Sequence, residues 1–135
     1  MTNASNFAKK DLSRVNLAAA NLAGADLHDA CLRDATLMDT NLEDADLTDT
    51  DLTNANLGGA SLRNASAAHA NLEGADLRDA DLSGTNLRGA HLGGAKLRDA
   101  DRAIAERDVA HPCALSNVAL LVREKQRQYY SRRRQ

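Results

Sequence analysis

The stretch NLEDADLTDTDLTNANL, residues 41–57, places a leucine at every fifth position. Five residues of an α-helix turn through about 500°, so these leucines would spiral around a helix without forming an apolar stripe. On a flat strand, an odd spacing would point every second leucine into water. A chain that turns in the same sense after each short extended piece directs every leucine towards one axis instead. The spacing therefore predicts a wound chain, an all-β solenoid.

The same spacing extends over most of the chain. Central positions run from Phe7 to Leu97, and the nineteen repeats are interrupted only at Ala67. A small residue, Ala or Thr, stands two positions before most centres, which suits a narrow core. Asn or Asp before the leucine, and Gly, Asp or Asn two residues after it, favour repeated tight turns. A five-residue unit cannot bury its own leucine, so stability must come from stacked neighbours.

The pattern A(D/N)LXX is present verbatim as ADLHD at 25–29, ADLTD at 45–49, ANLEG at 70–74 and ADLRD at 75–79. In this pattern the chain resembles the pentapeptide repeat proteins. The resemblance implies a right-handed quadrilateral β-helix with four repeats per coil, hence about 4.75 coils and a rod about 23 Å long. The spacing alone implies neither the four repeats nor the handedness. The predicted core columns include Phe7, Leu12, Leu32, Leu52, Leu72 and Leu92.

The repeats stop after Leu97, because Arg102 occupies the next central position, where an inward charge is costly. This divides the chain into a repeat domain, 1–100, and a C-terminal segment, 101–135. A helix is predicted from about 114 to 131, after Pro112. We expect this helix to cap the open end of the rod and to form a homodimer. The residues predicted to make these contacts are Leu115, Val118, Leu121, Val122 and Tyr129.

Charge is distributed unevenly along the chain. Residues 5–100 hold fifteen acidic and nine basic side chains, whereas residues 101–135 hold four acidic and eight basic ones. Residues 26–51 contain nine acidic side chains and a single basic one, Arg33. This density of like charge favours a cationic partner, although a solvated turn surface also explains it. The predicted acidic partner surface consists of Asp29, Asp34, Asp39, Asp44 and Asp49.

The histidines and cysteines predict no catalytic, cofactor or metal site. His28 and His69 are expected about two coils apart, near 10 Å, which is too far for one metal. Cys31 and Cys113 form no CxxC pair. The many aspartates recur at turn positions, where a structural role explains them. The sequence therefore predicts a protein without enzymatic activity.

No apolar run has the length of a membrane span, since the longest aliphatic stretch is VALLV at 118–122. The N-terminus also lacks a run of signal-peptide length. A cytoplasmic protein is expected.

A non-enzymatic protein-interaction scaffold, with a protein partner that the sequence does not identify, fits these features. The resemblance implies an alternative, since some pentapeptide repeat proteins resemble B-form DNA in shape and charge and bind DNA gyrase, protecting it from quinolones or inhibiting it. Arg63, Arg78 and Arg88 in the later half of this short rod weaken that alternative. Nucleic-acid binding by the tyrosines and arginines at 129–134 is disfavoured because the acidic rod repels phosphate.

The break in the repeats at Ala67 leaves two interpretations. Replacing a buried leucine by alanine typically costs about 2–5 kcal/mol when a cavity remains. The change is either a drift that one coil tolerates or a notch for docking.

Overall fold

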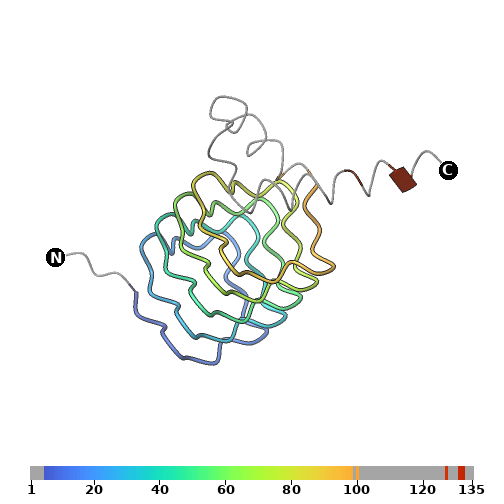
Figure 1. Cartoon of the computed structure of the whole chain (residues 1–135). Helices are drawn as coiled ribbons and strands as arrows, with labels where there is room; N and C mark the ends of the chain where they lie inside the picture. Colours follow the sequence, from blue (N-terminus) through green and yellow to red (C-terminus); the bar gives the residue numbers. More distant parts are fainter. Residues whose placement is uncertain (1–4, 99, 101–126, 128–130, 133–135) are drawn as a thin grey trace.

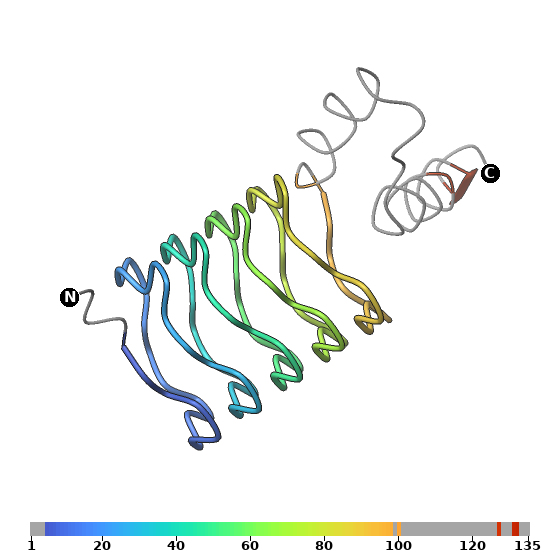
Figure 2. The same ribbon diagram turned by 60° about the vertical axis from the view of Figure 1, so that its left-hand side comes forward.

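The computed structural model describes residues 5–98, 100, 127, 131 and 132 of the 135-residue chain. Residues 5–98 wind into a β-helix whose coils have four sides (Figure 1) and stack in parallel layers along the rod (Figure 2). Bridged residues are twenty positions apart and parallel, as for Asp26 and Asp46. This register confirms four pentapeptides per coil and the quadrilateral β-helix.

Neighbouring coils pair through single residues. Within residues 5–98 the structure contains no strand longer than a bridge, and its fifteen isolated bridges run from Asn6–Asp26 to Asp76–Lys96. Each bridge lies at the residue before a central leucine. We number the sides by their pentapeptides. Side 1 holds residues 25–29 and 45–49, side 2 holds 30–34 and 50–54, side 3 holds 35–39 and 55–59, and side 4 holds 40–44 and 60–64, with the equivalents twenty residues away.

The backbone N–H groups explain why five residues form the repeating unit. In the pentapeptide 45–49, three N–H groups donate to neighbouring coils and one closes the preceding turn. The fifth, on the residue after the leucine, donates to the Asp side chain two positions earlier. The donor–acceptor distances are 3.1 Å for Ala45 N to Leu42 O, 2.9 Å for Asp46 N to Ala25 O, 2.6 Å for Leu47 N to Ser66 O, 3.0 Å for Thr48 N to Asp46 Oδ1 and 3.0 Å for Asp49 N to Ala68 O. All five donors are therefore satisfied.

The second residue after each centre turns the corner. From Lys9 to Gly94 this position has positive φ, between 57° and 63° for the non-glycine residues and between 68° and 72° for the glycines. A positive φ at the third residue of a turn closed by the leucine carbonyl defines a type II β-turn, which favours Gly, Asn and Asp. The predicted tight turns are confirmed, and their residue preference has this backbone cause.

The core consists of central leucines and the small residues two positions before them. Leu32, Leu52 and Leu72 stack in one column on side 2, each at most 1% exposed. Threonine replaces alanine at several small positions and binds the coil below. Thr50 Oγ1 donates to Leu27 O at 2.8 Å, so the buried hydroxyl is satisfied.

The interruption at Ala67 leaves the lattice intact. Ala67 is fully buried between Leu47 and Leu87 in its column. Its N–H donates to Asn86 O at 2.7 Å, within the range seen at the leucine positions. The hydrogen bond to the next coil is therefore kept where leucine is replaced by alanine.

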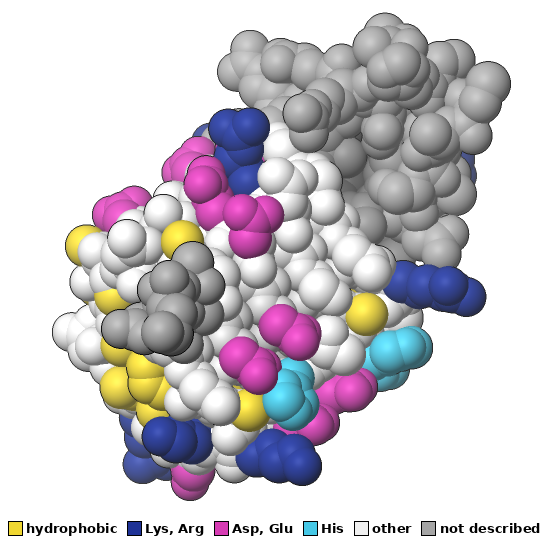
Figure 3. Space-filling view, turned by 90° about the vertical axis from the view of Figure 1, so that its left-hand side faces the viewer, with side chains coloured by type: hydrophobic (Ala, Val, Ile, Leu, Met, Phe, Trp, Pro, Cys, Tyr) yellow, Lys and Arg dark blue, Asp and Glu magenta, His cyan; other side chains and the backbone are white. Residues whose placement is uncertain are grey.

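The two ends of the rod differ from its middle. Phe7 and Leu12 are only partly buried, although they pack against the core, and hydrophobic side chains are visible at the N-terminal end (Figure 3). Lys10 Nζ lies 5.8 Å from the centre of the Phe7 ring, a cation–π contact that covers part of this end. At the other end, Leu92 is 5% exposed.

The predicted cap and dimer contacts lie outside the described residues, as do Arg102 and Pro112. Within the predicted helix 114–131, Arg127 and Ser131 are described, and both are helical and exposed. The homodimer and the cap therefore stay predictions. Among the described residues, none belongs to a helix with the length and apolarity needed to cross a membrane.

Replacing Leu52 by Asp should abolish cooperative thermal unfolding. Leu52 is fully buried in the middle of its column, and an inward carboxylate there has no partner among the aliphatic side chains. Circular dichroism during heating measures the effect. Asn54→Asp is the control, because it adds the same carboxylate at an exposed corner of the same pentapeptide. A Leu52→Asp protein that melts like the control would contradict the column arrangement.

Replacing Ala67 by Leu should stabilise the rod by about 1–2 kcal/mol, since leucine occupies the equivalent positions of the coils on either side, Leu47 and Leu87, and adds buried apolar surface there. Chemical denaturation measures the change. Ala68→Leu serves as the control, because it adds the same atoms one position later, at a half-buried place outside the column. Destabilisation by Ala67→Leu alone would show that neighbouring side chains already occupy this volume.

Candidate functional site

Side chains reach solvent from three positions in each pentapeptide: the residue before the leucine and the two residues after it. The five aspartates predicted as a partner surface all occupy the second residue after the leucine. They are five positions apart, so Asp29, Asp34, Asp39 and Asp44 lie at successive corners around one coil. Only Asp29 and Asp49 share a column. The structure therefore distributes these carboxylates around the rod instead of gathering them on one side.

Side 1 carries a denser acidic cluster that this set includes only in part. Asp26 and Asp46 stack on adjacent coils and form a parallel bridge. Asp29 and Asp49 hold the corner position of the same two pentapeptides and stack in a second column. These are the two places in residues 5–98 where carboxylates stack directly at equivalent positions of adjacent coils. Stacked like charges are unfavourable unless a cation lies near. We call these four residues, with His28, the side 1 cluster.

Arginine neutralises carboxylates on the other three sides. Arg33 lies 3.6 Å from Asp51 on side 2 and Arg63 lies 3.9 Å from Asp81 on side 4. Side 3 has a closer pair, described below. Among the described ion pairs, the only cationic group that reaches the side 1 cluster is the imidazole of His28.

His28 is hydrogen-bonded to one carboxylate of this cluster, Asp26. Its ring Nδ1 lies 2.5 Å from Asp26 Oδ1, which also accepts the His28 backbone N–H at 3.2 Å. The ring contact raises the pKa of His28, and the charges of Asp26, Asp29 and Asp46 act in the same direction. The same hydrogen bond lowers the pKa of Asp26. Histidine side chains are seen beside Asp and Glu side chains in Figure 3.

Asp26, His28 and Asp46 have the residue types and the proximity of a metal-binding group. One ligand atom from each lies within 4.8 Å of the other two. The spacing between His28 and the other histidines does not reveal this group, because the remaining ligands are aspartates. The group can be found in the sequence once the register is known. Its signal is two aspartates twenty residues apart, Asp26 and Asp46, with a histidine two positions after the first.

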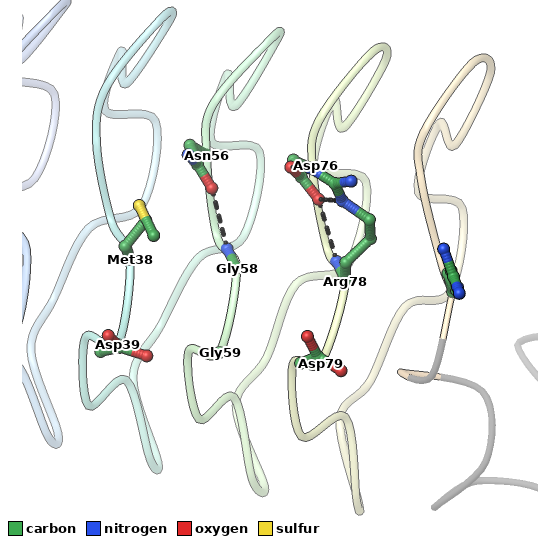
Figure 4. Close-up of a pocket in the computed structure, with 9 residues that line it drawn as sticks. Met38, Asp39, Asn56, Gly58, Gly59, Asp76, Arg78 and Asp79 are labelled. Carbon is green, nitrogen blue, oxygen red and sulfur yellow. Dashed lines mark hydrogen bonds and ion pairs between the residues drawn. The ribbon is translucent and has the colours of Figure 1, made fainter.

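Side 3 carries a shallow hollow of about 410 Å³ (Figure 4). It forms because Gly58 and Gly59 leave the outward positions of one coil without side chains. Met38, the exposed large hydrophobic residue among those described, lies on one side of the glycines, and Arg78 lies on the other. The Asp39 carboxylate lies where a Cβ of Gly59 would be. A side chain at residue 59 would therefore have to displace the Asp39 carboxylate, whereas its positive φ is one that Asn and Asp also adopt at this position.

Arg78 forms a bidentate ion pair at the rim of this hollow. Its Nε donates to Asp76 Oδ1 at 2.9 Å and its terminal nitrogen donates to Asp76 Oδ2 at 2.7 Å. The hydrogen bond from Arg78 lowers the pKa of Asp76. The two hydrogen bonds hold both side chains in place at the rim.

Arg78→Gln should reduce stability at neutral pH only slightly, because the guanidinium is half exposed and screened by solvent. Asp76 has a lower pKa in the folded state, so the pair contributes above the ordinary carboxyl pKa of 3.8. This contribution disappears as the pH falls through the folded-state pKa.

Melting temperatures of the wild-type and Arg78→Gln proteins across the acidic range measure this dependence. Arg63→Gln is the control, because it removes the same charge from a longer, 3.9 Å contact. The difference in melting temperature between wild type and Arg78→Gln should become smaller in acid, and it should do so more than the difference between wild type and Arg63→Gln. Equal acid dependence of the two differences would show that net charge, and not the bidentate pair, is responsible.

Comparison with known proteins agrees with the geometry. The family model for pentapeptide repeats matches in eight copies, over residues 3–39, 30–66, 40–79 and 68–101. HetL from the cyanobacterium Nostoc sp. strain PCC 7120, a pentapeptide repeat protein involved in heterocyst differentiation regulation, is 36% identical with a TM-score of 0.57, and the match covers 68% of this chain and 48% of HetL.

QnrB1, a plasmid-mediated fluoroquinolone resistance protein, shares the fold at 18% identity and a TM-score of 0.56, with 68% of this chain and 55% of QnrB1 covered. The chain spans about half the length of each of these two proteins. No curated protein sequence matches the chain.

Proposed function

Since this chain belongs to the pentapeptide repeat family, we propose that it is a non-enzymatic protein-interaction scaffold. Proteins of this family form right-handed quadrilateral β-helices and are generally structural or interaction proteins. One observation supports this proposal. The backbone hydrogen bonds repeat from one pentapeptide to the next, whereas the outward side chains differ from side to side. Such a rod presents a fixed spacing of charges to a partner.

Side 1 is the proposed partner surface. Four carboxylates, Asp26, Asp29, Asp46 and Asp49, stand on two adjacent coils there without an arginine or lysine in the same pentapeptides. Desolvating these groups against a partner is favourable only if the partner supplies positive charge. A basic protein surface is therefore the expected partner, and association should weaken as ionic strength rises.

The absence of enzymatic activity is part of the proposal. Catalysis needs a concave site that places a nucleophile, base or metal near substrate and excludes water. The hollow on side 3 is open, and its paired Asp76 and Arg78 hold each other. The buried polar side chains among those described are threonines of the core, and the hydroxyl of Thr50 is bound to a carbonyl of the coil below.

A DNA-mimicking modulator of DNA gyrase is the second candidate. The observation that favours it is the row Asp29, Asp34, Asp39, Asp44 and Asp49, which places one carboxylate at each corner as the chain winds. A winding row of negative charges has the character of a phosphate backbone. The later coils do not continue the row, since the same positions hold Asn54, Gly59, Asn64 and His69.

Two variants of equal charge separate binding by side 1 from general acidity. Asp29→Asn with Asp49→Asn removes two carboxylates from side 1, and Asp39→Asn with Asp44→Asn removes two from sides 3 and 4. A protein captured by the wild type from its native host should be lost from the first variant and kept by the second. Equal loss from both would show attraction by net charge alone, and equal retention would show that side 1 is not the surface.

A supercoiling assay with purified DNA gyrase tests the second candidate directly. The scaffold proposal expects no effect on supercoiling or on quinolone sensitivity at micromolar protein. Inhibition or protection that disappears in both double variants would instead support the DNA mimic, because both interrupt the corner row.

A further inference from the structure

We propose that Asp26, His28 and Asp46 form a binding site for a divalent transition metal ion of the zinc class, which links two adjacent coils on side 1. The geometry of the three ligand atoms carries this proposal, since each lies within 4.8 Å of the others. Ligands of a tetrahedral Zn²⁺ at about 2.1 Å from the metal are about 3.4 Å apart. The rearrangement needed is therefore small, and all three side chains are at the surface.

The backbone prepares both carboxylates for this role. Asp26 Oδ1 accepts the N–H of His28, and Asp46 Oδ1 accepts the N–H of Thr48 at 3.0 Å. Each carboxylate is thereby oriented through one oxygen. Its second oxygen has no hydrogen bond among the described residues. A metal ion would meet ligands whose rotamers the fold already restricts, which lowers the entropy cost of binding.

The imidazole decides the class of metal. Ca²⁺ and Mg²⁺ prefer oxygen ligands, whereas one nitrogen and two carboxylate oxygens suit Zn²⁺ and its Co²⁺ analogue. Binding requires an unprotonated ring nitrogen, so a proton carried by the coordinating nitrogen of His28 leaves to solvent as the metal enters. Solvent water completes the coordination, because the protein offers three ligands. No change of oxidation state is involved.

The site also relieves a repulsion built into the lattice. Asp26 and Asp46 are held on adjacent coils by their bridge and cannot separate without breaking it. No described lysine or arginine pairs with either carboxylate. A divalent cation between them compensates both charges, and it binds the folded rod in preference to the unfolded chain. Metal should therefore raise the melting temperature.

Titration of the full-length, tag-free protein with Zn²⁺ by calorimetry, and with Co²⁺ by visible absorption, tests the proposal. The wild type should bind one ion in this site and show the Co²⁺ d–d bands of a nitrogen-containing site. His28→Thr should weaken Zn²⁺ binding by about tenfold or more and change the bands. Threonine is tolerated at this position, since Thr48 occupies it one coil later.

Matched controls separate coordination from diffuse attraction. Asp46→Asn removes a proposed ligand, whereas Asp49→Asn removes the same charge from the same coil and side. His69→Asn removes an exposed histidine of side 1 that is not part of the group. Asp46→Asn should weaken binding and abolish the Zn²⁺-dependent rise in melting temperature, while the two controls keep both.

Three results would overturn the site. They are equal affinity of the wild type and His28→Thr, equal weakening by Asp46→Asn and Asp49→Asn, and no Zn²⁺ binding at millimolar concentration. A melting curve without metal checks that each variant is folded. These measurements do not involve a protein partner, so their outcome is independent of the proposed scaffold function.

Discussion

Backbone hydrogen bonds between adjacent coils hold the rod together. The core of the rod is thin, because it consists of the central leucines and the small residues beside them. Such a core buries little apolar surface per residue, so almost every backbone N–H and C=O group needs a hydrogen-bond partner. In the pentapeptide 45–49 every backbone N–H has an acceptor. Four donate to backbone carbonyls, and the fifth, on Thr48, donates to the side chain of Asp46.

That pairing gives an aspartate before a leucine two functions. Its first oxygen closes the turn, as Asp26 Oδ1 does for the N–H of His28. Its remaining oxygen points to solvent with little conformational freedom. Structural aspartates are thus also fixed surface charges, and the metal and partner surfaces proposed for side 1 use groups that the fold requires in any case.

The same lattice tolerates irregular residues, because each pentapeptide depends on its neighbours above and below. Ala67 is buried and keeps its hydrogen bond to the next coil, and Gly58 and Gly59 remove two outward side chains without a break in the bridges around them. The first change affects the interior and the second creates the hollow on side 3. Substitutions at outward positions such as these glycines change the surface of the rod, while the backbone hydrogen bonds stay the same.

The role of each residue within its pentapeptide could be predicted from the sequence. Leucine at the centre, a small residue two positions earlier, and Asn, Asp or Gly at the corner follow from periodicity and turn chemistry, and the structure contains each of them. Only the tertiary structure decided which pentapeptides meet. A spacing of five is compatible with different numbers of repeats per coil, and the twenty-residue register shown by the bridges is what brings Asp46 beside Asp26 and His28. The same register spreads Asp29, Asp34, Asp39 and Asp44 around the rod, because neighbours along the chain lie at different corners.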